Sequence, residues 1–279
     1  MKNFSICIAT RDNIPGLKSV IKSLLNNCKK KSDIEFLFTV NKDDFRTIKF
    51  LHSLKFLHKN FRVFYMSANH NYFDAAERLN LMSEKSRGKY VFFINDDMVM
   101  KSKNWDIKYL NFIKSLDKNR IFITYPKHNQ KNHNWPISAI IPKKWINITG
   151  KVSNSFEADT ELYIISTLLG KIYKINNIKI HHHGGIKIKK KQFNWKSTRY
   201  KLIKQNLKHP NSIFTLNKLF LALIDYEKLS YFLKKKKISM ILIYMKIIFL
   251  LFFYLQLIQK KTNLNFFQIL LTNLNRKNF

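Results

Sequence analysis

The first hundred residues alternate short apolar runs with amphipathic stretches, a pattern that predicts strands separated by helices. The predicted strands cover residues 4–9, 34–40, 61–66 and 90–94. The predicted helices run from Pro15 to Leu25, over residues 48–58 and over residues 74–86, and Gly88 is placed as the C-cap of the last one. Tyr90 to Ile94 is apolar without alternation, which is typical of a central strand covered on both faces. This order predicts an α/β protein with parallel βαβ units.

The second half of the sequence has a less regular pattern. It predicts strands over residues 121–125, 137–141, 172–175 and 178–180, and a helix from Glu157 to Leu169 that Gly170 closes. From about Lys187 the sequence becomes rich in lysine and then strongly apolar. We therefore expect an α/β domain over residues 1–200 and a helical C-terminal region over residues 201–279.

The chain carries a formal net charge of +34. Lysines are spread along the whole sequence without a nucleic-acid-binding motif, so we expect no nucleic-acid partner. The charge does favour anionic membrane surfaces and anionic ligands such as nucleotide diphosphates. Cys7 and Cys28 are the only cysteines, a usage that fits a reducing cytoplasm. The apolar run at the N-terminus is too short for a signal peptide.

Polar residues directly follow three of the predicted strands. They are Thr10-Arg11-Asp12, Asn41-Lys42-Asp43-Asp44 and Asn95-Asp96-Asp97. Parallel strands end at the same edge of a sheet, where ligands bind, so we expect these residues to lie close together. Asp96 and Asp97 would repel each other without a cation, and Mg²⁺ or Mn²⁺ prefers carboxylate oxygens. The pattern favours a divalent-metal site, with an ordinary exposed turn as the alternative.

The stretch from Asn80 to Asp97, N-x(7)-G-x-Y-V-F-F-I-N-D-D, resembles the family 2 glycosyltransferases, in which an apolar strand leads into an aspartate motif called DxD. Ser5 to Asn13 resembles the first strand of that family, and the similarity covers about residues 1–185. The resemblance implies a GT-A fold with a mostly parallel sheet, a nucleotide-sugar donor, for which we expect a UDP-sugar, and a divalent metal cofactor.

The same resemblance assigns roles to individual residues. Asp97 is implied as the direct metal ligand, with Asp96 supporting it or binding ribose, and Asn95 stands where the family has its first Asp. Uracil contact is implied for Asp43 or Asp44. The implied nucleotide-sugar contacts also include Thr10, Arg11, Asn80 and Asn95.

Asp159 falls in the first turn of the helix predicted from Glu157, where the helix dipole favours an ionised carboxylate. An ordinary helix-start acid is the alternative for this pattern alone. The segment resembles the Glu-Asp motif of the family, with Ala158 in the place of the Glu. The resemblance implies Asp159 as the catalytic base, and Glu161 is the second candidate.

Three consecutive histidines precede two glycines. Alternation along a strand places His181 and His183 on one face, and one of them is a candidate metal ligand. A loop of solvated histidines is the alternative. Trp135 is a candidate acceptor contact because aromatic faces stack on sugar rings, although tryptophans more often pack in a core.

An apolar stretch from Ile238 to Ile258 follows Lys234-Lys235-Lys236-Lys237 and is interrupted by Lys246. Its length permits a membrane span, and a helix lying in the plane of an anionic membrane or packed in the core also fits. We expect membrane association, at the inner face of the cell membrane.

Together these features predict an enzyme that transfers a sugar from a nucleotide sugar to an acceptor hydroxyl. By resemblance it inverts the anomeric centre and acts on a cell-envelope glycan or lipid-linked saccharide. The alternatives are a nucleotidyltransferase on a similar sheet and a non-enzymatic basic protein that binds nucleic acid or a membrane surface.

Overall fold

The computed structural model describes residues 2–57, 60–67, 74–116, 120–129, 135–183 and 216–233. The apolar stretch predicted to meet a membrane, residues 238–258, lies outside these described residues. Within the described residues no helix is both long enough and apolar enough to cross a bilayer.

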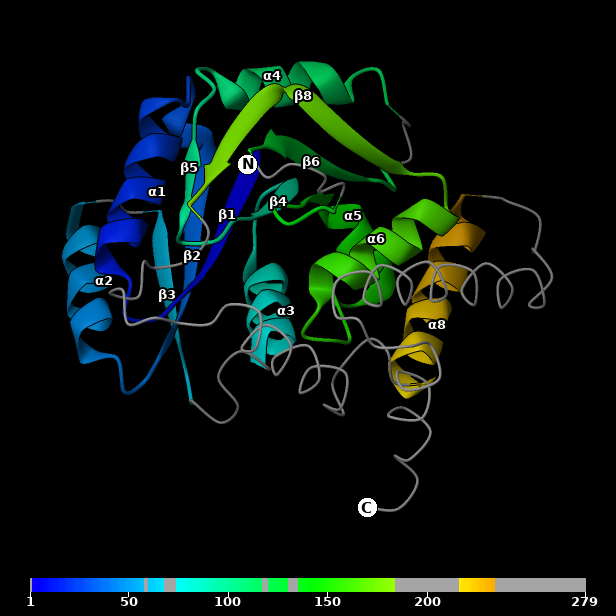
Figure 1. Cartoon of the computed structure of the whole chain (residues 1–279), viewed down its shortest axis with the longest axis horizontal. Helices are drawn as coiled ribbons and strands as arrows, with labels where there is room; N and C mark the ends of the chain where they lie inside the picture. The colour runs from blue at the N-terminus through cyan, green and yellow to red at the C-terminus, as the bar shows by residue number, and fades with distance from the viewer. Residues whose placement is uncertain are drawn as a thin grey trace, which may run out of the picture.

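The first half of the chain forms the predicted parallel βαβ units (Figure 1). Its elements are β1 (Phe4–Thr10), α1 (Ile14–Asn26), a short 3₁₀ helix (Lys31–Asp33), β2 (Ile34–Asn41), α2 (Phe45–Leu57), β3 (Phe61–Met66), α3 (Ala75–Lys85) and β4 (Tyr90–Phe93). Strand β1 lies between β2 and β4, and β3 pairs with β2, all in parallel. The carboxyl ends of β2, β1 and β4 therefore meet at one edge of the sheet.

The second half completes one mixed sheet with the strand order β3-β2-β1-β4-β7-β6-β8-β5. Its elements are β5 (Met98–Met100), α4 (Trp105–Ile113), β6 (Ile123–His128), β7 (Ile140–Pro142), α5 (Lys143–Thr149), α6 (Ala158–Leu168), β8 (Ile172–His182) and α8 (Leu216–Phe232). Strand β7 is antiparallel to β4 and β6, and β5 is antiparallel to β8. The fold is the α/β arrangement that the sequence pattern predicts, and it is GT-A-like, as the family resemblance implies.

Two details of the second half differ from the prediction. The two short strands predicted over residues 172–175 and 178–180 form the single strand β8, because it pairs with β6 through a register shift opposite Pro126 and Lys127. The sequence pattern also gave no signal for β5, α4 and α5 as separate elements.

Apolar side chains form a core on each face of the sheet. On one face, Phe4, Ile6 and Ile8 of β1 pack with α1, α2 and α4, and on the other face Cys7 of β1 packs with α3, α5, α6 and α8 (Figure 1). This alternation explains why the central strands are apolar throughout. Helix α8 lies beyond the boundary expected near residue 200, and its Leu219 and Leu223 belong to the second core.

Gly88 has a different role from the predicted C-cap. Helix α3 ends at Lys85, and its capping residue Ser86 has extended backbone angles. A Cβ atom on Gly88 would lie 2.5 Å from the backbone nitrogen of Ser5, and the N–H of Gly88 donates to Ser5 Oγ at 2.8 Å. Glycine is therefore required here because the chain passes close against β1.

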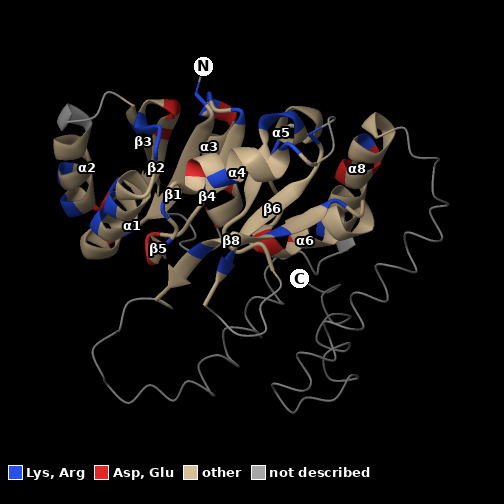
Figure 2. Ribbon diagram, turned by 90° about the horizontal axis from the view of Figure 1, so that it is seen from above, with Lys and Arg blue, Asp and Glu red and all other residues tan. Residues whose placement is uncertain are grey.

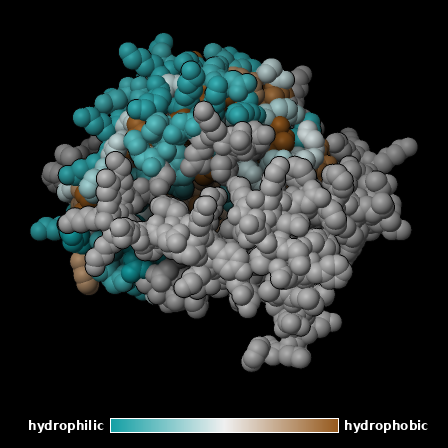
Figure 3. Space-filling model, in the orientation of Figure 1, coloured by the Kyte–Doolittle hydropathy of each residue, from teal (hydrophilic) through white to brown (hydrophobic). Residues whose placement is uncertain are grey.

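The described surface is largely hydrophilic in the orientation of Figure 1, with scattered apolar side chains (Figure 3). Lys and Arg occur on helices and strands on several sides of the fold (Figure 2). The charge therefore forms no single stripe in the described part of the chain, as the even spread of lysine in the sequence indicates.

Candidate active site

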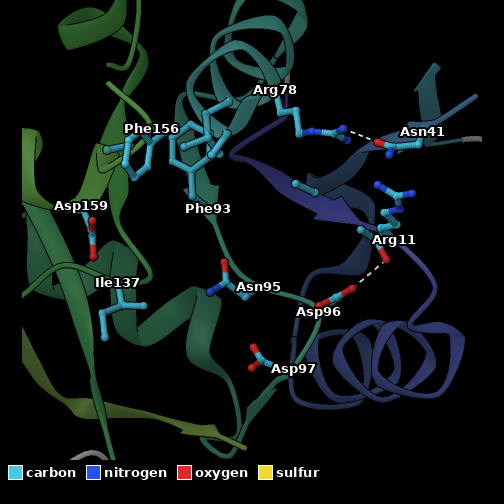
Figure 4. A pocket seen from close by; sticks show the side chains of 15 residues that line it. Arg11, Asn41, Arg78, Phe93, Asn95, Asp96, Asp97, Ile137, Phe156 and Asp159 are labelled. Carbon is cyan, nitrogen blue, oxygen red and sulfur yellow. Dashed lines mark hydrogen bonds between the residues drawn. The ribbon is translucent and has the colours of Figure 1, made fainter. Parts of the chain in front are cut away.

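A cleft of about 480 Å³ opens at the carboxyl ends of β2, β1 and β4 and extends to the start of α6 (Figure 4). Its polar lining residues are Thr10, Arg11, Asn41, Arg78, Asn95, Asp96, Asp97 and Asp159. Apolar side chains, including Phe93, Ile137 and Phe156, line the part between β4 and α6. The structure thus brings together most of the residues that were predicted to contact the donor.

Asp96 is held firmly at the end of β4. Thr10 Oγ1 donates to Asp96 Oδ2 at 2.7 Å, which links the ends of β1 and β4 (Figure 4). Burial raises the pKa of Asp96, and the neighbouring charge of Asp97 adds to the rise, while the hydrogen bond from Thr10 opposes it. A cation or a hydroxyl donor at this position would stabilise the ionised form.

Asp97 lies against a histidine, but against a different one from the two predicted. His182 Nε2 is 3.0 Å from Asp97 Oδ2, and both side chains are largely buried. The antiparallel pairing of β5 with β8 sets Met98 opposite His182, and the N–H of His183 donates to the carbonyl of Asp97 at 3.0 Å, which keeps Asp97 and His182 close together. His181 and His183 do share a face, as predicted, and their rings contact each other with centroids 4.6 Å apart.

Asp97 and His182 are a pair of side chains that could contribute ligands to a metal ion, and Asp96 is the neighbouring carboxylate. Carboxylate oxygens together with one imidazole nitrogen suit a divalent ion such as Mn²⁺. Among the described residues no group of three or more His, Cys, Asp or Glu side chains converges as a complete metal site. A metal here would take its remaining ligands from a bound substrate and water.

The acids after β2 do not line the cleft. Asp44 is buried in the turn, where it accepts hydrogen bonds from the backbone N–H groups of Asp12 and Thr47 at 2.7 and 3.1 Å. Burial opposes ionisation of Asp44, but these bonds outweigh it and lower its pKa. Asp43 is exposed and pairs with Arg11 at 3.4 Å. The residue of this segment that faces the cleft is Asn41.

Asn41 forms a buried pair with Arg78, a residue that the sequence analysis missed. Arg78 is 6% exposed on α3 and donates to Asn41 Oδ1 (Figure 4). Burial lowers the pKa of Arg78, and nearby Asp74 opposes this. Asn41 Nδ2 is buried and has no hydrogen-bond partner among the described residues. An arginine on the same helical face as Ala75, Leu79 and Met82 was the available sequence signal.

Asn80 lies on α3 but outside the cleft lining. Its Oδ1 accepts from the backbone N–H groups of Val152 and Ser153 at 2.8 and 3.2 Å, and its Nδ2 donates to the carbonyl of Ser153 at 2.8 Å. These three bonds use most of the amide's capacity. Asn80 therefore holds the loop before α6 and does not reach the cleft, where the resemblance implies a nucleotide contact for it.

The two candidate bases occupy different environments. Asp159 lines the cleft in the first turn of α6, across from Asn95 in Figure 4. Glu161 is 0% exposed and accepts hydrogen bonds from the backbone and side chains of Asn154 and Ser155 and from Ser153 Oγ, at 2.7–3.0 Å. Burial raises the pKa of Glu161 and these bonds oppose the rise. The geometry therefore favours Asp159 over Glu161 as a base.

Trp135 lies close to this side of the cleft without lining it. Its ring contacts the ring of Tyr163 on α6, with centroids 4.7 Å apart and planes tilted by 35°. Ile137, two residues further on, is the lining side chain of this segment. A direct contact between Trp135 and an acceptor stays a prediction.

The fold and the cleft define a class of protein: a GT-A-like enzyme with paired carboxylates at the carboxyl end of its central strand. The sequence comparison is more specific. Residues 5–223 match the sequence profile of Glycosyl transferase family 2, so the chain belongs to this family and is a glycosyltransferase. No curated protein matches the sequence.

Solved structures share the fold at low sequence identity. The mannosyltransferase PcManGT from Pyrobaculum calidifontis, in complex with GDP-Man and Mn²⁺, covers 98% of this chain and 86% of its own, with a TM-score of 0.59 and 8% identity. S. aureus TarS 1–349 in complex with UDP-GlcNAc covers 84% and 72%, with a TM-score of 0.52 and 13% identity. GalNAc-T7 with UDP, GalNAc and Mn²⁺ covers 65% and 44%, with a TM-score of 0.50 and 11% identity. At these identities the likeness shows the fold.

Proposed function

We propose that the enzyme transfers a sugar from a UDP-sugar to an acceptor hydroxyl, with a divalent metal at Asp97 and inversion at the anomeric carbon. The observation that carries the proposal is the order of groups along one cleft. The hydrogen-bond donors of Asn41 and Arg78 lie at one end of the cleft. Asp96 and Asp97 lie in the middle, and Asp159 lies at the other end. This order matches base, diphosphate and reacting sugar in a nucleotide-sugar donor.

The pairing at the Asn41 end supports recognition of a base that presents carbonyl oxygens. A guanidinium group only donates hydrogen bonds, so the Asn41 atom that faces Arg78 must be the oxygen, and Nδ2 is left as a donor. A buried donor without a partner is costly, and a ligand acceptor would satisfy it. Uracil carries two carbonyl oxygens, which favours a uridine nucleotide. Guanine, the base of the GDP-Man bound by PcManGT, is the alternative.

A divalent metal is supported by the adjacent carboxylates Asp96 and Asp97 at the cleft, and by Mn²⁺ in the PcManGT and GalNAc-T7 structures. When bound, such an ion would neutralise the negative charge that develops on the leaving diphosphate. Thr10 holds Asp96 in place, and His182 orients the Asp97 carboxylate. Arg11, which also lines the cleft, adds positive charge on the donor side.

Asp159 supports the chemical step from the acceptor side. Its position in the first turn of α6 favours the ionised carboxylate, and the backbone N–H of Thr160 donates to its Oδ1 at 2.9 Å. We assign it the proton of the acceptor hydroxyl. The acceptor oxygen forms the new bond to the anomeric carbon while the bond to the diphosphate breaks, and UDP leaves with the electron pair.

The acceptor and the place of action are proposed from the surface of α8. Four of the six large hydrophobic side chains exposed on the described residues lie on this helix: Phe220, Ile224, Tyr231 and Phe232. The run Lys234 to Lys237 begins two residues after the end of α8 in the sequence. Apolar side chains beside a basic run suit an anionic lipid surface. We therefore propose action at the cytoplasmic face of the cell membrane, on a cell-envelope glycan or lipid-linked acceptor.

Turnover of a donor library tests the proposal. Purified enzyme with Mn²⁺ is incubated with UDP-, GDP-, CDP- and dTDP-sugars, with and without lipid-linked and oligosaccharide acceptors, and the released nucleoside diphosphate is measured. Release of UDP with transfer of the sugar supports the proposal. A parallel incubation contains a nucleoside triphosphate and a sugar phosphate, and release of pyrophosphate there would identify a nucleotidyltransferase instead.

A further inference from the structure

A buried hydrogen-bond network joins α8 to the loop that precedes the proposed base. Asn154 Nδ2 donates to Glu161 Oε1 at 2.7 Å and to Asp225 Oδ2 at 3.0 Å. Glu161 belongs to α6 and Asp225 to α8, and they are 0% and 3% exposed. Both hydrogens of the Asn154 amide are thus directed to carboxylates, which fixes its orientation. Lys228 Nζ, 3.4 Å from Asp225 Oδ1, offsets part of the negative charge.

The same loop is held from a third helix. Asn80 of α3 bonds the backbone of Val152 and Ser153, so α3, α6 and α8 all hold the short segment from Val152 to Ser155. The next residue, Phe156, lines the cleft. Asp159, which also lines the cleft, follows in the first turn of α6. The position of this loop therefore sets the position of the acceptor side of the cleft.

We propose that Asp225 is a positioning residue for the transfer reaction, although it lies 66 residues beyond Asp159 in the sequence and outside the cleft. By accepting from Asn154 it holds the loop against α6, and this keeps Phe156 and Asp159 aligned with the donor. The inference rests on the proposed function of Asp159. In this proposal α8 contributes a residue that positions the catalytic groups, in addition to forming part of the surface.

Two substitutions at Asp225 separate the roles. Asp225→Asn keeps an oxygen that can accept from Asn154, whereas Asp225→Ala leaves one Asn154 hydrogen without an acceptor. We expect Asp225→Ala to lower kcat roughly tenfold or more, since small misplacements of reacting groups carry such costs. Affinity for UDP with Mn²⁺ should stay as in the wild type, and Asp225→Asn should restore most of kcat.

The matched control is Asp106→Ala. Asp106 is equally buried, at 2% exposure, and accepts from the backbone N–H groups of Lys29 and Lys30 at 3.0 and 2.9 Å, outside the cleft lining. Its loss should reduce stability and leave kcat unchanged at temperatures well below unfolding. A fall in kcat caused only by weaker folding would appear in both variants.

Amide hydrogen exchange gives a readout that needs no turnover. In the full chain without substrate, Asp225→Ala should speed exchange of the amides of Asn154 and Ser155, while Asp106→Ala and Asp225→Asn should not. Unchanged exchange in Asp225→Ala, or an unchanged kcat, would overturn the positioning role. If the wild type transfers sugar from no donor, the proposed function fails, and the exchange arm still decides whether Asp225 fixes the loop.

Discussion

Replacing Glu161 with glutamine distinguishes a structural carboxylate from a catalytic one. Glu161 is fully buried, and within the described part of the chain every bond that it accepts comes from Ser153, Asn154 or Ser155. Glutamine has nearly the same shape but replaces one acceptor oxygen with an NH₂ group. We expect Glu161→Gln to lower the free energy of unfolding substantially, because an added donor then faces groups that are donors themselves.

The magnitude follows from which bonds survive. Glu161 Oε2 accepts from Ser153 Oγ and from the N–H groups of Asn154 and Ser155, and Oε1 accepts from Asn154 Nδ2. If the glutamine oxygen takes the Oε2 position, its NH₂ group faces Asn154 Nδ2. At least one buried donor then lacks an acceptor, at about 1–3 kcal/mol each, and the charge assistance of the other bonds is lost. The expected destabilisation is about 2–4 kcal/mol.

The assay pairs urea unfolding, followed by circular dichroism, with turnover measured as released nucleoside diphosphate. Asp159→Asn is the matched variant, because it removes a carboxylate from the same helix at the cleft side. It should change stability little and lower turnover by roughly two orders of magnitude or more. The reasoning is refuted if Glu161→Gln unfolds like the wild type but loses turnover, while Asp159→Asn stays active.

Three further predictions concern the scaffold and the C-terminal region. Gly88→Ala should lower the free energy of unfolding by about 2–3 kcal/mol in urea unfolding, since its Cβ would lie against the backbone of Ser5. A decrease of less than about 0.5 kcal/mol would contradict the close approach of Gly88 to β1. Burial opposes ionisation of Asp106, but bonds from backbone N–H groups outweigh it and lower its pKa below the usual range for Asp. The folded-state pKa of Asp106 is thus below the unfolded-state pKa. Ionised Asp106 therefore stabilises the protein at pH values above the range in which Asp usually titrates, and this stabilisation is lost as the pH falls through the folded-state pKa. The stability gap between wild type and Asp106→Asn should therefore narrow in acid; a gap that widens would reverse the sign. Ending the chain after Leu233 should release the protein from anionic liposomes in a flotation assay while it stays folded. Ending the chain before Leu216 should unfold the protein, because Leu219 and Leu223 belong to the core. A soluble full-length protein that aggregates when cut after Leu233 would place the tail in the core.

The sequence predicted the parallel half of the fold well because its strands are continuous apolar runs. Tyr90 to Phe93 is buried on both faces, so burial alone defines it as a central strand. Elements in the second half depend on long-range pairing. Strand β5 has only three residues and pairs with the end of β8, at residues that lie 80 to 84 positions later in the sequence. No local pattern in Met98 to Met100 carries that information.

The sequence predicted where the site lies more reliably than which side chains contact one another in it. Strand ends placed Thr10, Asp96 and Asp97 together, because parallel strands share an edge. Alternation placed His181 and His183 on one face but could not say which face meets Asp97, since the register with β5 decides this.

Residue type also did not reveal burial. Asn80, Asp44 and Glu161 have the polar groups expected at a substrate site, yet each satisfies backbone N–H groups of a neighbouring loop or turn. Conversely, Arg78 and Asn41 line the cleft because the fold buries them together. Such assignments depend on tertiary contacts that a local motif does not contain.

The most direct test of the account is calorimetric titration of UDP into the protein with and without Mn²⁺, in the wild type and in Asp97→Ala. Asp33→Ala, at the opposite end of β2, is the control. We expect Mn²⁺ to strengthen UDP binding to the wild type and to Asp33→Ala, and to have no effect on Asp97→Ala, with all three proteins folded. Equal affinity with and without Mn²⁺ in the wild type, or an unchanged Mn²⁺ effect in Asp97→Ala, would contradict a metal-dependent nucleotide-sugar site at Asp97.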